Sequence, residues 1–364
     1  MLRTTSFIKI WLLVAALFFF NGAFSQEKGT AGHPKNVVLL IGDGMGLAQV
    51  YAAQTASTEQ LNILKAKHMG MMTTYSANND VTDSGAGGTA IATGFKTKNG
   101  MIGMKPDSTA VPSMLDIFGN LGLSTGVVVS CAVTHATPAS FVAKDISRNN
   151  FEAIALDYLD SPVNVVVGGG LKHFNQRKDG RLLTNEIGSK GIAVLPAIPT
   201  TDFAKYNNVY VLTDSVHPPK MSEGRGDHLP DGSRFALEVL NKNNKGFFLM
   251  IEGSQIDWAG HANDSSYLLA EMRDFDKTVG EVLAFAEKNP ETLVIVTADH
   301  ETGGLTFPQG ALKGSIRFAY STGDHTGIMV PVYAFGPGAE AFTGFYDNTD
   351  IIRKIMSVYG YSFE

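Results

Sequence analysis

Apolar residues are spaced along this chain in two different patterns. Short runs dominated by aliphatic and aromatic residues are typical of strands buried on both faces, and they occur at 36–42, 124–130, 163–167, 246–251 and 292–297. Two further strands are predicted at 70–75 and 328–335, the second of them as the last strand of the chain.

The segments between these runs have apolar residues every three to four positions, which predicts helices. The clearest helix follows Asp264, an expected N-cap, and places Leu268, Met272 and Phe275 on one face. Another begins at Ser84, and the rest are predicted at 47–56, 114–121, 151–159, 234–240 and 350–359. The alternation predicts an α/β fold, a three-layer sandwich with a largely parallel central sheet and helices on both faces.

Three glycine-containing or irregular stretches interrupt this pattern. The stretch 171–229 has no regular period, so we expect excursions outside the main sheet there. The glycines at 168–170 lack the following Gly-Lys-Ser/Thr of a P-loop, which favours a tight turn. The turn 42–46 has Leu47 in place of the third glycine of a dinucleotide fingerprint, and Asp43 inside it would repel a pyrophosphate.

The first residues have the composition of a targeting segment. Arg3 and Lys9 precede an apolar run from Ile10 to Phe20, and small residues follow within 23–25, where a signal peptidase would cleave. The run is too short to span a bilayer comfortably. We therefore expect 1–25 to be a removed signal peptide and 26–364 to be a single domain without a membrane span, periplasmic or secreted.

Composition narrows the class of protein further. The chain of 364 residues is 44% hydrophobic and 18% charged, as in globular proteins, and its formal net charge is −6. An acidic chain has no basic surplus to neutralise phosphates, so no nucleic-acid binding is expected. Cys131 is the only cysteine, which excludes an internal disulfide, and its apolar surroundings predict a buried structural thiol.

Three predicted strands are each followed closely by an acid: Asp43, Glu252 and Asp299. The carboxyl ends of parallel strands meet at one edge of a sheet, which is where ligands bind in such folds. Three bare carboxylates at one edge would repel each other, and divalent cations are the natural remedy.

Histidines are predicted at the same edge. Asp257 and His261 are four residues apart and so lie on one side of a helical turn, His300 adjoins Asp299, and His325 precedes the strand at 328–335. Each alone has an ordinary alternative, a surface pair or a solvated loop histidine, but their joint occurrence at strand ends favours a metal site. Mixed Asp and His ligands suit zinc.

An all-oxygen set, in contrast, suits magnesium. Asp43, Glu252 and the hydroxyl of Thr137 form such a set. The other five histidines have no comparable context and are treated as background: His33, His68, His173, His217 and His228.

Ser84 is the candidate nucleophile. It stands beside Asp83 at the start of a run of small residues, where a helix N-terminus can receive an anion. The alternative is that Asp83 and Ser84 only cap the helix, which is the commoner role of such residues. The metal ligands predicted elsewhere favour the chemical role.

Taken together, five blocks of the chain resemble the alkaline phosphatases of bacteria and animals. The resemblance runs in order from about residue 36 to the C-terminus, and it rests on Asp83-Ser84 with 94–100, 135–139 with Arg148, the set Glu252, Asp257 and His261, 297–301, and 324–327. It implies hydrolysis of small-molecule phosphate monoesters to alcohol and phosphate, through a phosphoserine at Ser84.

The resemblance also implies the cofactors, two Zn²⁺ and one Mg²⁺, and the residues that hold them. One zinc would be bound by Asp257, His261 and His325, the second by Asp43, Asp299 and His300, and magnesium by Asp43, Thr137 and Glu252. Arg148 would bind the phosphate, because its planar guanidinium can hold two phosphate oxygens.

Two departures from the family pattern stand out. Some bacterial relatives have Asp and Lys where this chain has His135 and Trp258, so the surroundings of magnesium and phosphate are altered, and the magnesium affinity and optimum pH of those relatives do not transfer. The chain is also shorter than many relatives, which leaves the homodimer usual in the family as one possibility.

Three alternative functions are compatible with parts of the pattern. A sulfatase would need Cys or Ser followed by x-Pro-x-Arg, which is absent after Ser84. A phosphodiesterase of the same superfamily generally lacks the third-metal set that Thr137 and Glu252 provide. An exported metal- or phosphate-binding protein without turnover would not need a hydroxyl at the metal pair.

Overall fold

The computed structural model describes residues 33–309 and 316–363, so the predicted signal peptide lies outside the described residues. A ten-stranded sheet forms the centre, in the order β14-β2-β13-β8-β1-β7-β3-β4-β6-β5. Its strands are β1 (Asn36–Gly42), β2 (His68–Thr73), β3 (Ser124–Ala132), β4 (Val165–Gly169), β5 (Ala193–Leu195), β6 (Val209–Leu212), β7 (Phe247–Gly253), β8 (Thr292–Thr297), β13 (Val330–Phe335) and β14 (Gly344–Asp347). Only β13 runs antiparallel to its neighbours, so the sheet is largely parallel as predicted.

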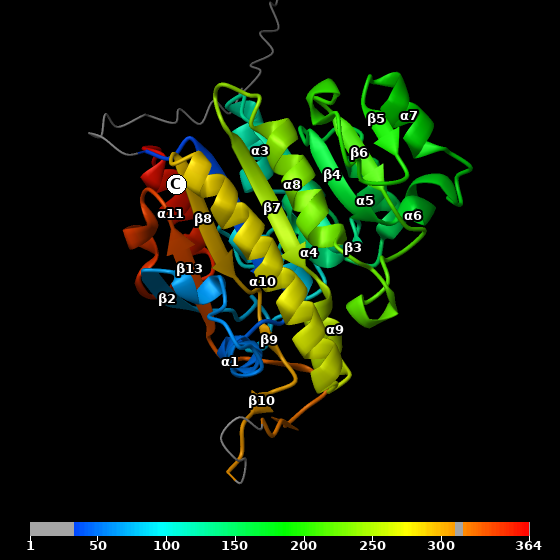
Figure 1. Cartoon of the computed structure of the whole chain (residues 1–364). Helices are drawn as coiled ribbons and strands as arrows, with labels where there is room; N and C mark the ends of the chain where they lie inside the picture. Colours follow the sequence, from blue (N-terminus) through cyan, green and yellow to red (C-terminus); the bar gives the residue numbers. More distant parts are fainter. Residues whose placement is uncertain (1–32, 310–315, 364) are drawn as a thin grey trace, which may run out of the picture.

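Helices cover both faces of this sheet. They are α1 (Leu47–Thr55), α2 (Ser84–Thr93), α3 (Met114–Asn120), α4 (Ala136–Val142), α5 (Phe151–Asp157), α6 (Leu171–Asn175), α7 (Leu183–Ser189), α8 (His228–Leu240), α9 (Gln255–His261), α10 (Ser265–Lys288) and α11 (Asp350–Val358). Figure 1 shows α8 and α10 crossing in front of the strands. None of the helices within the described residues is long and apolar enough to cross a membrane.

Two adjacent residues of β7 show how the three layers pack. Successive side chains of a strand point to opposite faces. The ring of Phe247 packs edge-on against Phe285 of α10, whereas Phe248 stacks on Phe118 of α3 at 5.4 Å between ring centroids. The central strand is thus buried on both sides, which explains why its sequence is continuously apolar rather than alternating.

The predicted excursion over 171–229 is wrong in part. This stretch contributes β5 and β6, which extend the main sheet at one edge: β6 pairs in parallel with β4, and β5 pairs in parallel with β6. The two strands have only three and four residues, which is too short for a periodic pattern to be recognised in the sequence. The tight turn predicted at 168–170 is also shortened, because its first two glycines still belong to β4 and only Gly170 adopts a positive φ, of 102°.

The strand predicted at 328–335 is present as β13 but is not the last of the chain. β14 follows it and pairs in parallel with β2 at the opposite edge. Phe345 in β14 is 80% exposed, so this edge strand lacks the buried apolar run by which the inner strands were recognised.

The register of the central strands aligns their carboxyl ends. Ile41 of β1 is paired with Glu252 of β7 on one side and with Thr297 of β8 on the other. Asp43, Glu252 and Asp299 therefore emerge at the same edge of the sheet, as the sequence predicts.

Candidate active site

The first group of ligands joins α9 to the short ribbon formed by β9 (Glu301–Thr302) and β12 (His325–Thr326). One ligand atom from each of Asp257, His261 and His325 lies within 4.8 Å of the others. The Asp257 carboxylate is 3.4 Å from Nε2 of each histidine, and the two Nε2 atoms are 3.2 Å apart. The i, i+4 spacing of Asp257 and His261 on a helix produces this convergence.

Backbone carbonyls fix the orientation of both imidazoles. Nδ1 of His261 lies 2.7 Å from the Gly323 carbonyl, and Nδ1 of His325 lies 2.8 Å from the Thr82 carbonyl. A carbonyl can only accept, so each Nδ1 carries the proton in the neutral ring and each Nε2 presents a lone pair. This is the usual arrangement behind a metal-binding histidine.

The second group lies beside Ser84 and is fully buried. It consists of Asp43, Asp299 and His300, with His300 Nε2 3.4 Å from Asp43 Oδ1 and 3.3 Å from Asp299 Oδ2. Because β8 ends at Thr297, the pair Asp299 and His300 has left the strand and can face one point, as the prediction required. The Ser84 hydroxyl lies 3.2 Å from the same Nε2 atom.

Ser84 is the first residue of α2, so its hydroxyl stands at the positive end of the helix dipole. The run of small residues lets this helix pack closely against its surroundings. A Cβ added at Gly88 would lie 2.9 Å from the Ser140 hydroxyl of α4, and one added at Gly87 would lie 3.1 Å from the Asp299 carbonyl. The glycines thus allow Ser84 to approach the second ligand group.

Asp83 caps this helix and also holds Arg148. Its Oδ1 accepts a hydrogen bond from the backbone N–H of Ala86, and its Oδ2 accepts from Gly100 N and, at 2.9 Å, from Nη1 of Arg148. The capping role that was the alternative for Asp83 is therefore confirmed. The same carboxylate thus holds the guanidinium at the residue that directly precedes Ser84.

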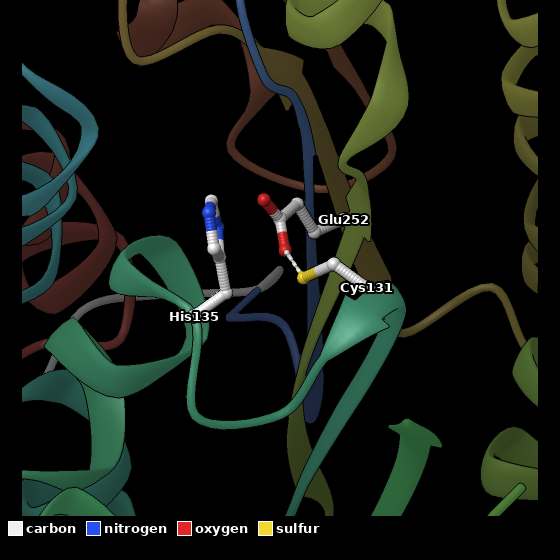
Figure 2. A group of neighbouring side chains, drawn as sticks. All are labelled: Cys131, His135 and Glu252. Atoms are coloured by element: carbon white, nitrogen blue, oxygen red, sulfur yellow. Dashed lines mark hydrogen bonds between the residues drawn. The ribbon is translucent and has the colours of Figure 1, made fainter. Parts of the chain in front are cut away.

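The third group surrounds Glu252, which is fully buried at the end of β7. The Thr137 hydroxyl, in the first turn of α4, lies 3.4 Å from Asp43 Oδ2, which links this group to the second. One ligand atom from each of Cys131, His135 and Glu252 also lies within 4.8 Å of the others. Figure 2 shows the carboxylate of Glu252 between the thiol and the imidazole.

Burial and mutual repulsion shift the pKa values of the acids upward. Burial raises the pKa of Asp43 well above its ordinary value, and repulsion from Asp299 raises it further. Burial likewise raises the pKa of Asp299 to about 6 and that of Glu252 to about 7. The ionised form of such an acid is unfavourable unless a nearby cation compensates its negative charge.

The histidines of the two zinc-type groups differ in basicity. The hydrogen bond to Asp257 raises the pKa of His261 to about 9, whereas burial and His325 hold the pKa of His300 well below its usual range. Burial alone would raise the pKa of Asp257, but its hydrogen bonds to His261 and His325 bring it well below the ordinary value.

These residues fit the metals that the sequence implies. Asp43 Oδ1, Asp299 Oδ2 and Glu252 Oε1 are buried and have no hydrogen-bond partner among the described residues. Unsatisfied buried acceptors are costly in a folded protein unless a cation or water completes them. The donor sets are two Asp/His clusters and an oxygen-rich cluster, as zinc and magnesium respectively prefer.

Besides Cys131, which is buried as predicted but was not expected at the site, sequence reasoning missed two residues. Thr302 donates to Asp257 Oδ1 and lies 3.2 Å from His300 Nδ1, so it connects the first two groups. His217, treated as background, packs its ring 4.7 Å from Trp258 and 5.9 Å from His135. Neither has a spacing signal, because each reaches the site through a loop or ribbon far away in sequence.

The fold and the three clustered ligand groups beside a helix-borne serine define a metal-dependent hydrolase. The model of the family described as alkaline phosphatase matches residues 34–318. "Alkaline phosphatase 4" of Bacillus subtilis (strain 168) is 33% identical over 91% of this chain and 91% of its own length. The structure of alkaline phosphatase from the Antarctic bacterium TAB5 is 42% identical, with a TM-score of 0.87 over 90% of this chain and 98% of that chain.

A further structure is a mutant of the TAB5 enzyme in which a histidine is replaced by aspartate, with Mg bound in its M3 site. It is 40% identical, with a TM-score of 0.88 over 92% of this chain and all of that chain. The chain belongs to the alkaline phosphatase family. It is a hydrolase of phosphate monoesters, and the prediction of that activity from the sequence is confirmed.

Proposed function

We propose that this phosphatase acts through a phosphoserine intermediate on Ser84, at a site that holds two zinc ions and one magnesium ion. The observation that carries the proposal is the position of the Ser84 hydroxyl, buried at the N-terminus of α2 and 3.2 Å from a histidine that shares a ligand group with two unpartnered acids. A capping serine on an ordinary helix would have no such neighbours.

We assign one metal ion to each ligand group. One zinc would be held by Asp257, His261 and His325, the second by Asp43, Asp299 and His300, and magnesium by Asp43, Thr137 and Glu252. When bound, these ions would neutralise the acids, favour the deprotonated Ser84 hydroxyl and compensate the charge that develops on the phosphate and leaving oxygens. The Mg-bound mutant of the TAB5 enzyme supports a third site of this kind.

Side chains of the protein itself bind and orient the substrate phosphate. The Ser84 oxygen attacks phosphorus, the ester bond to the alcohol breaks, and water later releases phosphate from Ser84. Arg148, oriented by its ion pair with Asp83, binds phosphate oxygens through its remaining N–H groups. His135 and Trp258 lie near the third group, with rings 5.9 Å apart, and would shape the surroundings of magnesium and phosphate.

Trapping the intermediate tests this proposal. The metal-loaded enzyme is mixed with a simple aryl phosphate, quenched in acid and digested, and the phosphorylated peptide is identified by mass spectrometry. We expect the phosphate on Ser84, two zinc and one magnesium per chain, and far faster turnover of monoesters than of diesters. Phosphate on another residue, or turnover without any phosphoenzyme, would refute the assignment of Ser84.

We further propose that the protein is exported and cleaved after residue 25, and that 26–364 forms one domain. The charged and apolar pattern of 1–25 supports this. N-terminal sequencing of protein recovered from the periplasm or medium tests the cleavage site. Light scattering on the same purified sample distinguishes a monomer from a homodimer.

A further inference from the structure

The third ligand group contains a thiol, which distinguishes it from the two zinc-type groups. The single S–H of Cys131 has two acceptors within reach, the Ala132 carbonyl at 3.2 Å from Sγ and Glu252 Oε2 at 3.5 Å from Sγ, and Figure 2 shows the second contact, between Cys131 and Glu252. Both residues are fully buried, and they come from neighbouring strands, β3 and β7. His135 approaches the same carboxylate from the start of α4.

Glu252 is therefore shared by two donor sets of different chemistry. Asp43 and Thr137 offer oxygen, which magnesium prefers, whereas Cys131 and His135 offer sulfur and nitrogen, which select ions of the zinc class. Two atoms are available on the soft side: Glu252 Oε1 and His135 Nδ1 are buried and have no hydrogen-bond partner among the described residues.

We propose that the third site also binds a thiophilic divalent cation, through Cys131, His135 and Glu252, and that this cation displaces magnesium. The proposal rests on the third site of the proposed function and adds to it a soft set of ligands. On binding, the Cys131 S–H bond breaks, its proton leaves to solvent and a sulfur–metal bond forms. His135 contributes its free nitrogen lone pair and Glu252 its carboxylate.

The distances allow this arrangement after small side-chain rotations. The three ligand atoms now lie within 4.8 Å of one another. Ligands on one tetrahedral zinc lie about 3.3–3.8 Å apart, as follows from bond lengths of about 2.0–2.3 Å. The carboxylate of Glu252 and the imidazole of His135 can rotate about their side-chain bonds to shorten these distances.

Cadmium is a suitable probe because Cys131 is the only cysteine of the chain, so any thiolate–metal absorption band must come from it. Enzyme loaded with zinc and magnesium is titrated with Cd²⁺ while ultraviolet absorption and released metals are measured. We expect a thiolate-to-cadmium band that saturates at one cadmium per chain, with release of one magnesium. Absence of the band at saturating cadmium would overturn the proposal.

Cys131→Ser is the matched variant, because it keeps the size of the side chain and removes the soft ligand. We expect it to lose the band and to need at least about tenfold more cadmium to release magnesium. Magnesium release at the same cadmium concentration as in the wild type would contradict a role for the thiol. The wild-type band does not depend on whether this variant folds.

Glu252→Gln separates this inference from the proposed function. A magnesium content that falls in Glu252→Gln, together with no cadmium band in the wild type, leaves the magnesium site standing and overturns the soft site. A cadmium band in a wild type whose magnesium content does not depend on Glu252 supports the soft site and refutes the magnesium assignment.

Discussion

At the scale of single residues, reactivity depends on what surrounds each functional group. Ser84 has an ordinary hydroxyl, but it lies at a helix N-terminus beside buried acids and His300. We expect Ser84→Ala to lower kcat by at least about 10³-fold, since the nucleophile is lost, with metal content and melting temperature nearly unchanged. Ser233→Ala is the control, because this buried hydroxyl on α8 has no partner in the described structure. Full activity of the alanine variant at position 84 would contradict the scheme.

Arg148 is proposed to bind the phosphate and not to react with it. Its guanidinium already makes one ion pair with Asp83 and remains partly exposed, so further N–H groups can reach a phosphate. We expect Arg148→Ala to lower kcat/KM by about 10–100-fold, and Arg148→Lys to recover part of it, since an ammonium keeps the charge but not the fork. Steady-state kinetics measure both. Equal values for Arg148→Lys and wild type would show that the fork is not used.

At the scale of elements, α2 depends on its cap for both stability and geometry. We expect Asp83→Ala to lower the free energy of unfolding by about 1–2 kcal/mol, because the Ala86 N–H loses its partner. Asp83→Asn retains an oxygen for the cap, but its amide N–H₂ replaces the oxygen that accepts from Gly100 and Arg148, so it should recover only part of the lost stability while KM rises. Chemical denaturation combined with kinetics separates the two effects. A normal KM in Asp83→Asn would contradict the positioning role.

At the scale of the whole molecule, the ligand cluster makes stability depend on pH when metals are removed. Asp43, Asp299, Glu252 and His261 all have raised pKa values, so the folded state holds more protons than the unfolded state. The free energy of unfolding therefore falls as pH rises, from about 4 to about 7 for Asp299 and Glu252 and from about 6.5 to about 9 for His261, and Asp43 contributes in the same direction. Asp257 has the opposite sign, but its effect is confined below its ordinary pKa of 3.8. His300 and His135 also have the opposite sign, because burial lowers their pKa values, so the free energy of unfolding rises through them as pH approaches about 6.5.

We accordingly expect the melting temperature of chelator-treated protein to decrease between about pH 6.5 and about pH 9, where Glu252 and His261 lose the protons that the folded state retains. The melting temperature of metal-loaded protein should change much less with pH, because bound cations keep the ligands deprotonated. Differential scanning fluorimetry of the two forms across this range makes the comparison. Parallel pH profiles for chelated and loaded protein would show that the cluster is not linked to the metals.

The strength of each sequence prediction followed the strength of its physical signal. The inner strands β1, β3, β4, β7 and β8 are buried on both faces and were recognised from their apolar runs. The outer strands β5, β6 and β14 were missed. β5 and β14 lie at the two edges of the sheet, where a strand needs no buried apolar run, and β6, one position in from β5, has a buried run of only four residues. Thr302 and His217 were missed for a related reason: they are ordinary residue types in segments without a period.

By itself, the sequence determined the layered α/β fold, the acids at the strand ends and the family. These follow from local periodicity and from residues that stand directly after buried strands. Only the tertiary structure decided which atoms meet: the thiol of Cys131 at Glu252, Thr302 between two ligand groups, and Arg148 held on Asp83. Such contacts join positions distant in sequence, and their distances depend on the register and packing of the whole sheet rather than on any local pattern.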